Sequence, residues 1–152
     1  MDEETIDRLK SSFAEVARHR DEVAALFYER LFVADPGLRR LFFRSDPSIQ
    51  GTKLMATLAL IINNLSHLEA VRPTLRDLAI RHVGYGVQQA HYQTLGDALI
   101  QTLALFFADR FTPELRAAWR ALYRDVSDIM IAAAYQPETR ARDCGAAQIA
   151  TA

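Results

Sequence analysis

The chain has 152 residues, of which half are hydrophobic and about a quarter charged, with a formal net charge of −1. This length suffices for one domain with a real core, and the interspersed charges argue against a nucleic-acid-binding face. The longest apolar stretch, residues 54–62, is too short to span a bilayer. The acidic start, Met1 to Glu4, argues against a secretory or mitochondrial leader, and a single cysteine excludes an internal disulfide. We therefore expect one cytoplasmic domain.

Apolar periodicity predicts helices along almost the whole chain and no strand of useful length. Three of the five prolines follow a capping residue, as in Asp35-Pro36, Asp46-Pro47 and Thr112-Pro113, which indicates helix starts. After Gln136 the apolar pattern ends, so we expect a domain over residues 1–136 and a flexible tail over residues 137–152. The predicted helices are residues 3–18, 21–33, 36–42, 47–66, 73–83, 90–109 and 112–135.

The stretch from residue 81 to residue 92 is the most informative part of the sequence. His82 ends a predicted short helix, and Gly84 and Gly86 interrupt the helical pattern after it. Tyr92 lies in the first turns of the next predicted helix. The sequence has no second metal ligand at a helical spacing from His82, no cysteine pair and no His-Glu-x-x-His motif. A lone histidine is either an ordinary packed side chain or the single protein ligand of a metal that a cofactor holds, as in haem proteins.

The order of several segments resembles the globin family, and within it the bacterial single-domain globins and the globin part of flavohaemoglobins. No single segment is diagnostic, but together they span about residues 5–135 in order and with family-like spacings. The resemblance implies an all-α globin fold, with about seven to eight helices in a 3-over-3 sandwich around haem b. The matching segments are residues 26–32, 36–42, 50–55, 75–82, 87, 91–96 and 118–123.

The resemblance implies a role for each matching residue. His82 corresponds to the proximal haem ligand, while Tyr28 and Gln50 correspond to residues on the distal side. A tyrosine hydroxyl and a glutamine amide can both donate a hydrogen bond to an oxygen ligand that carries partial negative charge. The other expected cofactor-binding residues are Phe42 or Phe43 against the ring, Lys53 at a propionate, and Leu54, Val87, Tyr92, Leu95 and Leu99.

One position departs from the flavohaemoglobin pattern. In those proteins a glutamate of the last helix acts through a tyrosine on the proximal histidine; here Tyr92 matches the tyrosine, but Ala134 stands at the glutamate position. A carboxylate there would increase the imidazolate character of His82 and favour O–O cleavage. Without it, we expect the site to hold oxygen rather than split it.

The resemblance implies reversible binding of O2, NO and CO, with oxygen transport or nitric oxide dioxygenase activity. Nothing after residue 135 could bind a flavin or a nicotinamide, so a separate reductase is the expected partner. The alternatives are a haem-based gas or redox sensor and a helical domain that has lost its haem. The sequence does not distinguish a monomer from a homodimer.

Other conspicuous residues are expected to have structural roles. His91 is expected at a helix start, His19 in solvent between two helices, and His67 at a helix C-terminus, where its charged form would suit the dipole. Trp119 is expected to anchor the packing of the last two helices. Cys144 is expected to be an exposed thiol without a function.

Overall fold

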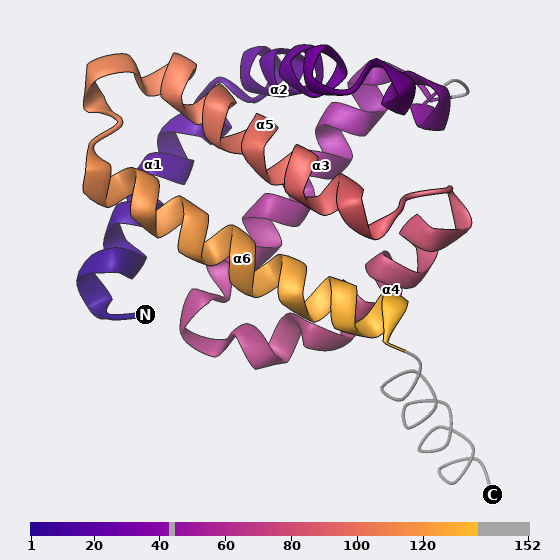
Figure 1. Ribbon diagram of the computed structural model, residues 1–152. Helices are drawn as coiled ribbons and strands as arrows, with labels where there is room; N and C mark the ends of the chain where they lie inside the picture. Colours follow the sequence, from indigo (N-terminus) through magenta and orange to yellow (C-terminus); the bar gives the residue numbers. More distant parts are fainter. Residues whose placement is uncertain (43–44, 137–152) are drawn as a thin grey trace, which may run out of the picture.

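The structure, a computed structural model, describes residues 1–42 and 45–136 (Figure 1). These ranges contain no strand, which confirms the prediction of an all-α fold. Cys144, Phe43 and the predicted tail over residues 137–152 lie outside the described residues. The α-helices are α1 (Glu3–Arg18), α2 (Arg20–Ala34), α3 (Pro47–Asn63), α4 (Arg72–Gly84), α5 (Gln89–Phe107) and α6 (Pro113–Tyr135), and the 3-10 segments are η1 (Pro36–Phe42), η2 (Leu65–Val71) and η3 (Ala108–Arg110).

Helices α5 and α6 run antiparallel beside each other, and the end of α6 lies close to α4 (Figure 1). Helix α2 packs against α5 and α3, whereas α4 packs mainly against α6. The helices bury their apolar faces in one continuous core. Its largest fully buried side chains are Trp119, Phe27, Leu9, Leu31, Leu75 and Leu103.

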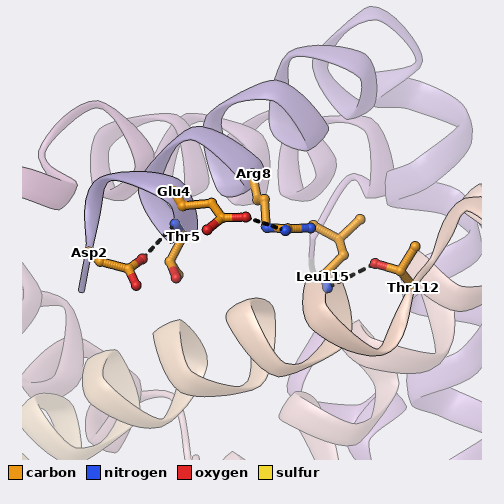
Figure 2. A network of polar contacts seen from close by, with 6 residues as sticks. All are labelled: Asp2, Glu4, Thr5, Arg8, Thr112 and Leu115. Carbon is orange, nitrogen blue, oxygen red and sulfur yellow. Dashed lines mark hydrogen bonds and ion pairs between the residues drawn. The ribbon is translucent and has the colours of Figure 1, made fainter.

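Capping side chains fix where the first and the last helix begin. The Asp2 carboxylate accepts a hydrogen bond of 2.8 Å from the backbone N–H of Thr5, and the Thr112 hydroxyl accepts one of 3.2 Å from that of Leu115. Figure 2 shows these two helix starts together with the Glu4–Arg8 ion pair of α1. Pro113 follows Thr112 at the first position of α6, so the Thr-Pro signal marks the helix start as the sequence predicts.

Two predicted helices differ from the structure. Residues 36–42 form the 3-10 segment η1 instead of an α-helix. The helix predicted over residues 47–66 ends at Asn63, since the Asn64 side chain donates to the Leu60 carbonyl at 2.7 Å and its backbone N–H turns to the Ile61 carbonyl. His67 then lies inside η2 with non-helical torsion angles, φ −141° and ψ 54°, so its predicted place at a helix C-terminus is wrong.

The crossing of α5 and α6 is very close because one residue lacks a side chain. A Cβ atom added to Gly96 would lie at or within 3.0 Å of three ring carbons of Tyr123. The hydroxyl of Tyr123 donates to the backbone carbonyl of Tyr92, which ties α6 to the first turn of α5. Nearer the start of α6, the indole N–H of the buried Trp119 donates to the Ser12 hydroxyl at 3.0 Å. This bond joins α6 to α1, whereas the sequence predicts an anchor between the last two helices.

No single helix in residues 1–42 and 45–136 has both the length and the apolar character needed to cross a membrane. Helices Pro47–Asn63 and Leu65–Gly84 pass that test only as a pair, and the chain bends by 116° between them.

Candidate functional site

The local structure around His82 is a helix end of the Schellman type. The backbone N–H of Val87 donates to the His82 carbonyl, and that of Gly86 donates to the Val83 carbonyl, both at 3.0 Å. Gly86 has a φ of +96°, which a glycine adopts without a steric penalty. We call residues 83–88, between His82 and the start of α5, the proximal corner. The left-handed backbone of this corner explains why a glycine, Gly86, follows His82 in the sequence.

The imidazole of His82 is half-buried and lacks a hydrogen-bond partner. Burial lowers the pKa of His82, and it outweighs the opposite influence of the Leu78 carbonyl one turn earlier. The Leu78 carbonyl acts on the ring, but its geometry is not that of a normal hydrogen bond. Nδ1 is buried and makes no hydrogen bond of normal geometry to any described residue. The ring is therefore neutral near pH 7, which is the form that binds a metal.

Tyr92 is the second residue of this region with a buried, unpaired polar atom. Its side chain is buried, and its hydroxyl has no hydrogen-bond partner in the described part of the chain. Burial raises the pKa of this hydroxyl to about 12, and the nearby Tyr135 adds to the effect. Where the sequence resemblance implies a carboxylate acting through this tyrosine, the chain has Ala134, and the tyrosine hydroxyl has no acceptor among the described residues.

Tyr28 and Gln50 meet where α2 crosses the start of α3. The Tyr28 hydroxyl donates to the backbone carbonyl of Gln50 at 3.2 Å, a long bond that joins the two helices. Burial raises the pKa of Tyr28 to about 12, so its hydroxyl stays protonated at neutral pH. Its ring packs edge-on against Phe42 of η1, with 5.6 Å between the centroids. The structure thus brings together three of the residues predicted for the distal side and the ring contact.

The remaining predicted residues differ in how accessible they are. Lys53 is exposed, and Leu99 is fully buried in the core. Leu54, Val87 and Leu95 are half-buried, like Tyr28, Phe42 and Leu78, and all of them pack against the core. Half-buried apolar side chains from four helices and η1 could be covered further by an apolar cofactor.

His91 does not compete with His82 as a metal ligand. Its Nδ1 accepts a hydrogen bond of 3.0 Å from the backbone N–H of Gln88, which completes a capping box at the start of α5. His91 therefore has the helix-start role that the sequence predicts. Within residues 1–42 and 45–136, no three His, Cys, Asp or Glu side chains gather where they could hold a metal ion by themselves. A metal at His82 would need a cofactor for its other ligands.

Sequence reasoning missed two tyrosines of α6 that organise this region. Tyr123 binds the backbone of Tyr92, and the Tyr135 hydroxyl donates to the Val87 carbonyl at 2.6 Å. Both occupy ordinary positions in the apolar pattern of the last helix. Their bonds to the backbone of a distant segment leave no signal in a single sequence, so the structure was needed to find them.

Comparison with known proteins identifies the family. The sequence model described as Globin matches residues 25–130, which is more than half of the chain. The chain belongs to the globin family. This globin is 25% identical over 133 residues to a flavohemoprotein of Bacillus subtilis and 28% identical over 134 residues to one of Rhodopirellula baltica. In each case the match covers 86% of this chain and 33% of the relative, so the globin spans about a third of their length.

Solved structures give the same fold. A bacterial globin from Campylobacter jejuni aligns with a TM-score of 0.77 at 21% identity, over 90% of this chain and 99% of its own. An engineered carbene transferase, based on a protein named as a nitric oxide dioxygenase from Rhodothermus marinus, aligns with a TM-score of 0.80 at 22% identity. That match covers 93% of this chain and 99% of the other. The fold is therefore the globin fold that the sequence resemblance implies.

Membership of the family implies a haem cofactor and diatomic gas ligands. The residues present fit such a cofactor. Three buried side-chain polar atoms in the described residues lack a partner, and two of them belong to His82 and Tyr92. Unpaired buried polar atoms are rare and need an explanation, such as a group that the protein binds.

Proposed function

We propose that this globin binds haem b through His82 and reversibly takes up O2, NO and CO. The observation that carries the proposal is the neutral, half-buried imidazole of His82, held at a Schellman helix end and without a hydrogen bond at Nδ1. When bound, haem would supply an iron that takes up a diatomic gas. His82 would hold that iron through an imidazole nitrogen.

Tyr28 and Gln50 have the donors to hold an oxygen ligand. The single proton of the Tyr28 hydroxyl is donated to the Gln50 carbonyl at 3.2 Å, a length at which a hydrogen bond is weak. A partly negative acceptor competes well with a neutral carbonyl, so a rotation of the hydroxyl would transfer the bond to the ligand. The Gln50 side chain adds an amide donor that carries no charge at any ordinary pH.

We infer that the reaction is nitric oxide dioxygenation, with oxygen binding or transport as the other use of the same site. Nitric oxide and oxygen combine to nitrate with the uptake of one electron: NO + O2 + e⁻ gives NO3⁻. The chain matches about a third of the length of proteins named flavohemoprotein, and one structural neighbour is named for this activity. We therefore propose that a reductase supplies the electron.

The visible spectrum of the purified protein in the ferric, ferrous and CO-bound states tests haem binding. We expect a Soret band that shifts under CO; a colourless protein after growth with ample haem would contradict the proposal. The oxygenated protein is then mixed with nitric oxide, a flavin reductase, free flavin and NADH as the electron donor. Continued nitrate production supports the enzyme, whereas a single turnover that reduction cannot renew supports oxygen binding alone.

A further inference from the structure

Four side chains form a cluster where α2 is followed by η1. Tyr28 and Phe32 are four residues apart on α2, so they lie on the same face of that helix. Arg39 and Phe42 are three residues apart in η1, and side chains at this spacing share one side of a 3-10 helix. The rings of Phe32 and Phe42 meet edge-on, with 5.6 Å between their centroids. One face of each element therefore takes part in this contact.

Phe32 contacts both Arg39 and Tyr28. The guanidinium carbon of Arg39 lies over the Phe32 ring, 4.9 Å from its centroid, which is within the range of a cation–π interaction. The Phe32 ring stacks on that of Tyr28, with 6.1 Å between the centroids and 28° between the planes. Arg39 is exposed, whereas the two rings are half-buried. A single side chain thus links an exposed cation to the ring of Tyr28.

The Phe32 ring is the only partner of the Arg39 side chain among the described residues. The neighbouring Arg40 is also exposed, and it makes no ion pair or ring contact within residues 1–42 and 45–136. With about three residues per turn, the side chain of Arg40 leaves η1 about 120° away from that of Arg39. Of these two arginines, Arg39 alone joins η1 to α2 through the cluster.

The phenol of Tyr28 is held by three rings and by one long hydrogen bond. Phe27 and Phe42 meet its ring edge-on, with 5.1 Å and 5.6 Å between the centroids, and Phe32 stacks on it. The hydrogen bond of its hydroxyl to the Gln50 carbonyl, at 3.2 Å, is the one that the proposed function exchanges for a bond to the ligand. Once that exchange is made, the rings around Tyr28 determine where its hydroxyl points.

We propose that Arg39 is a positioning residue: through the Phe32 ring it fixes η1 against α2 and thereby sets the direction of the Tyr28 hydroxyl. The inference rests on the proposed function, in which Tyr28 donates to the oxygen ligand. Arg39 itself contacts neither the hydroxyl nor the ligand. An exposed residue of η1 is thereby coupled to the group that holds the oxygen.

The test compares Arg39→Gln with Arg40→Gln in the full chain. Each variant removes one positive charge from the same segment, so a general electrostatic effect should appear in both. Glutamine remains polar but cannot form the cation–π interaction. Because both arginines are exposed, we expect both variants to fold.

The first measurement is the aromatic NMR spectrum of the haem-free protein, in which the signals of Tyr28 are assigned by their loss in Tyr28→Phe. The currents of neighbouring rings shift these signals, so they report how the Tyr28 ring lies against Phe32 and Phe42. We expect them to move in Arg39→Gln and to stay in place in Arg40→Gln. Identical Tyr28 signals in both variants would overturn the inference.

The second measurement is the rate of oxygen dissociation from the haem-loaded protein. Arg39→Gln should raise the rate about two- to fivefold, the factor that corresponds to a cation–π interaction of about 0.5–1 kcal/mol, and Arg40→Gln should leave it unchanged. In a Tyr28→Phe background, Arg39→Gln should have no further effect, because the hydroxyl that it positions is absent. An equal acceleration in both backgrounds would mean that Arg39 does not act through Tyr28, and the inference would be wrong.

The inference and the proposed function can fail separately. A protein that binds no haem, or one whose oxygen dissociation is the same in Tyr28→Phe, contradicts the proposed function or the role of Tyr28 in it. The NMR signals of the haem-free protein then decide whether Arg39 positions the Tyr28 ring. Signals common to the original protein and to both arginine variants would show that it does not.

Discussion

The α5–α6 crossing and the region around His82 differ in whether their polar side chains find partners within the protein. At the crossing, Gly96 leaves just enough room for the ring of Tyr123, and the hydroxyl of that ring is bonded to the Tyr92 carbonyl. Around His82, two buried polar atoms lack partners, and several apolar side chains are only partly buried. The polar group at the crossing is bonded within the protein, whereas the unpaired polar atoms and partly exposed apolar side chains around His82 are features of a binding site.

Substitutions in the two regions should therefore have different effects. A change at the crossing should lower the stability of the haem-free protein, since it removes or overfills packing. A change at His82 should affect what the protein binds and leave its stability nearly as it was. The following variants separate the two regions, beginning with the largest expected effect.

His82→Ala should abolish tight haem binding. Loss of a residue that only supports a metal ligand costs about 10–100-fold in metal affinity, so loss of the ligand itself should cost more. The measurement is a titration of the haem-free protein with hemin, followed at the Soret band. His67→Ala is the control, since His67 is exposed in η2 and outside the proposed site. An unchanged affinity of the His82 variant would show that another residue binds the iron.

Gly96→Ala should destabilise the haem-free protein by about 1–3 kcal/mol, because the added methyl group overlaps the ring of Tyr123. The ring cannot move away without losing the bond of its hydroxyl to Tyr92. Urea denaturation measures the change. Gly84→Ala is the control: a Cβ there meets nothing within 4 Å, and alanine in a helix should be neutral or stabilising by up to about 1 kcal/mol. Equal midpoints for both variants would mean that the crossing tolerates the methyl group.

Tyr28→Phe should accelerate oxygen dissociation about five- to tenfold, since it removes one hydrogen bond of roughly 1 kcal/mol to the ligand. Stopped-flow displacement of oxygen by CO measures the rate. Tyr85→Phe, which also removes one tyrosine hydroxyl, is the matched control. An unchanged rate in Tyr28→Phe would mean that its hydroxyl stays with the Gln50 carbonyl when oxygen binds.

The helical fold and the place of His82 could be read from the sequence because they depend on local signals. Proline after a capping residue marked the start of α6, and glycine behind His82 marked the helix end that the Schellman bonds create. The break at Asn64 could not be predicted, because its side chain competes locally for a carbonyl inside an apolar run that favours helix. The bonds of Tyr123 and Tyr135 could not be predicted either, since each joins α6 to backbone more than 30 residues away.

The smallest expected effect is that of pH on the rate of oxygen dissociation. Tyr28 and Gln50 differ from a histidine in this respect, because neither changes its charge in the neutral range. Burial raises the pKa of Tyr28 to about 12, so its hydroxyl remains a donor throughout the neutral range, and Gln50 has no charge to gain. The rate should therefore stay constant between about pH 6 and 10, below the ordinary tyrosine pKa. At higher pH the stability of the fold changes as well. Between about pH 10 and 12 the unfolded chain loses the tyrosine proton before the folded protein does, so the free energy of unfolding falls as the pH rises. A step in the dissociation rate between about pH 6 and 8 would mean that a histidine, and not Tyr28, controls the ligand.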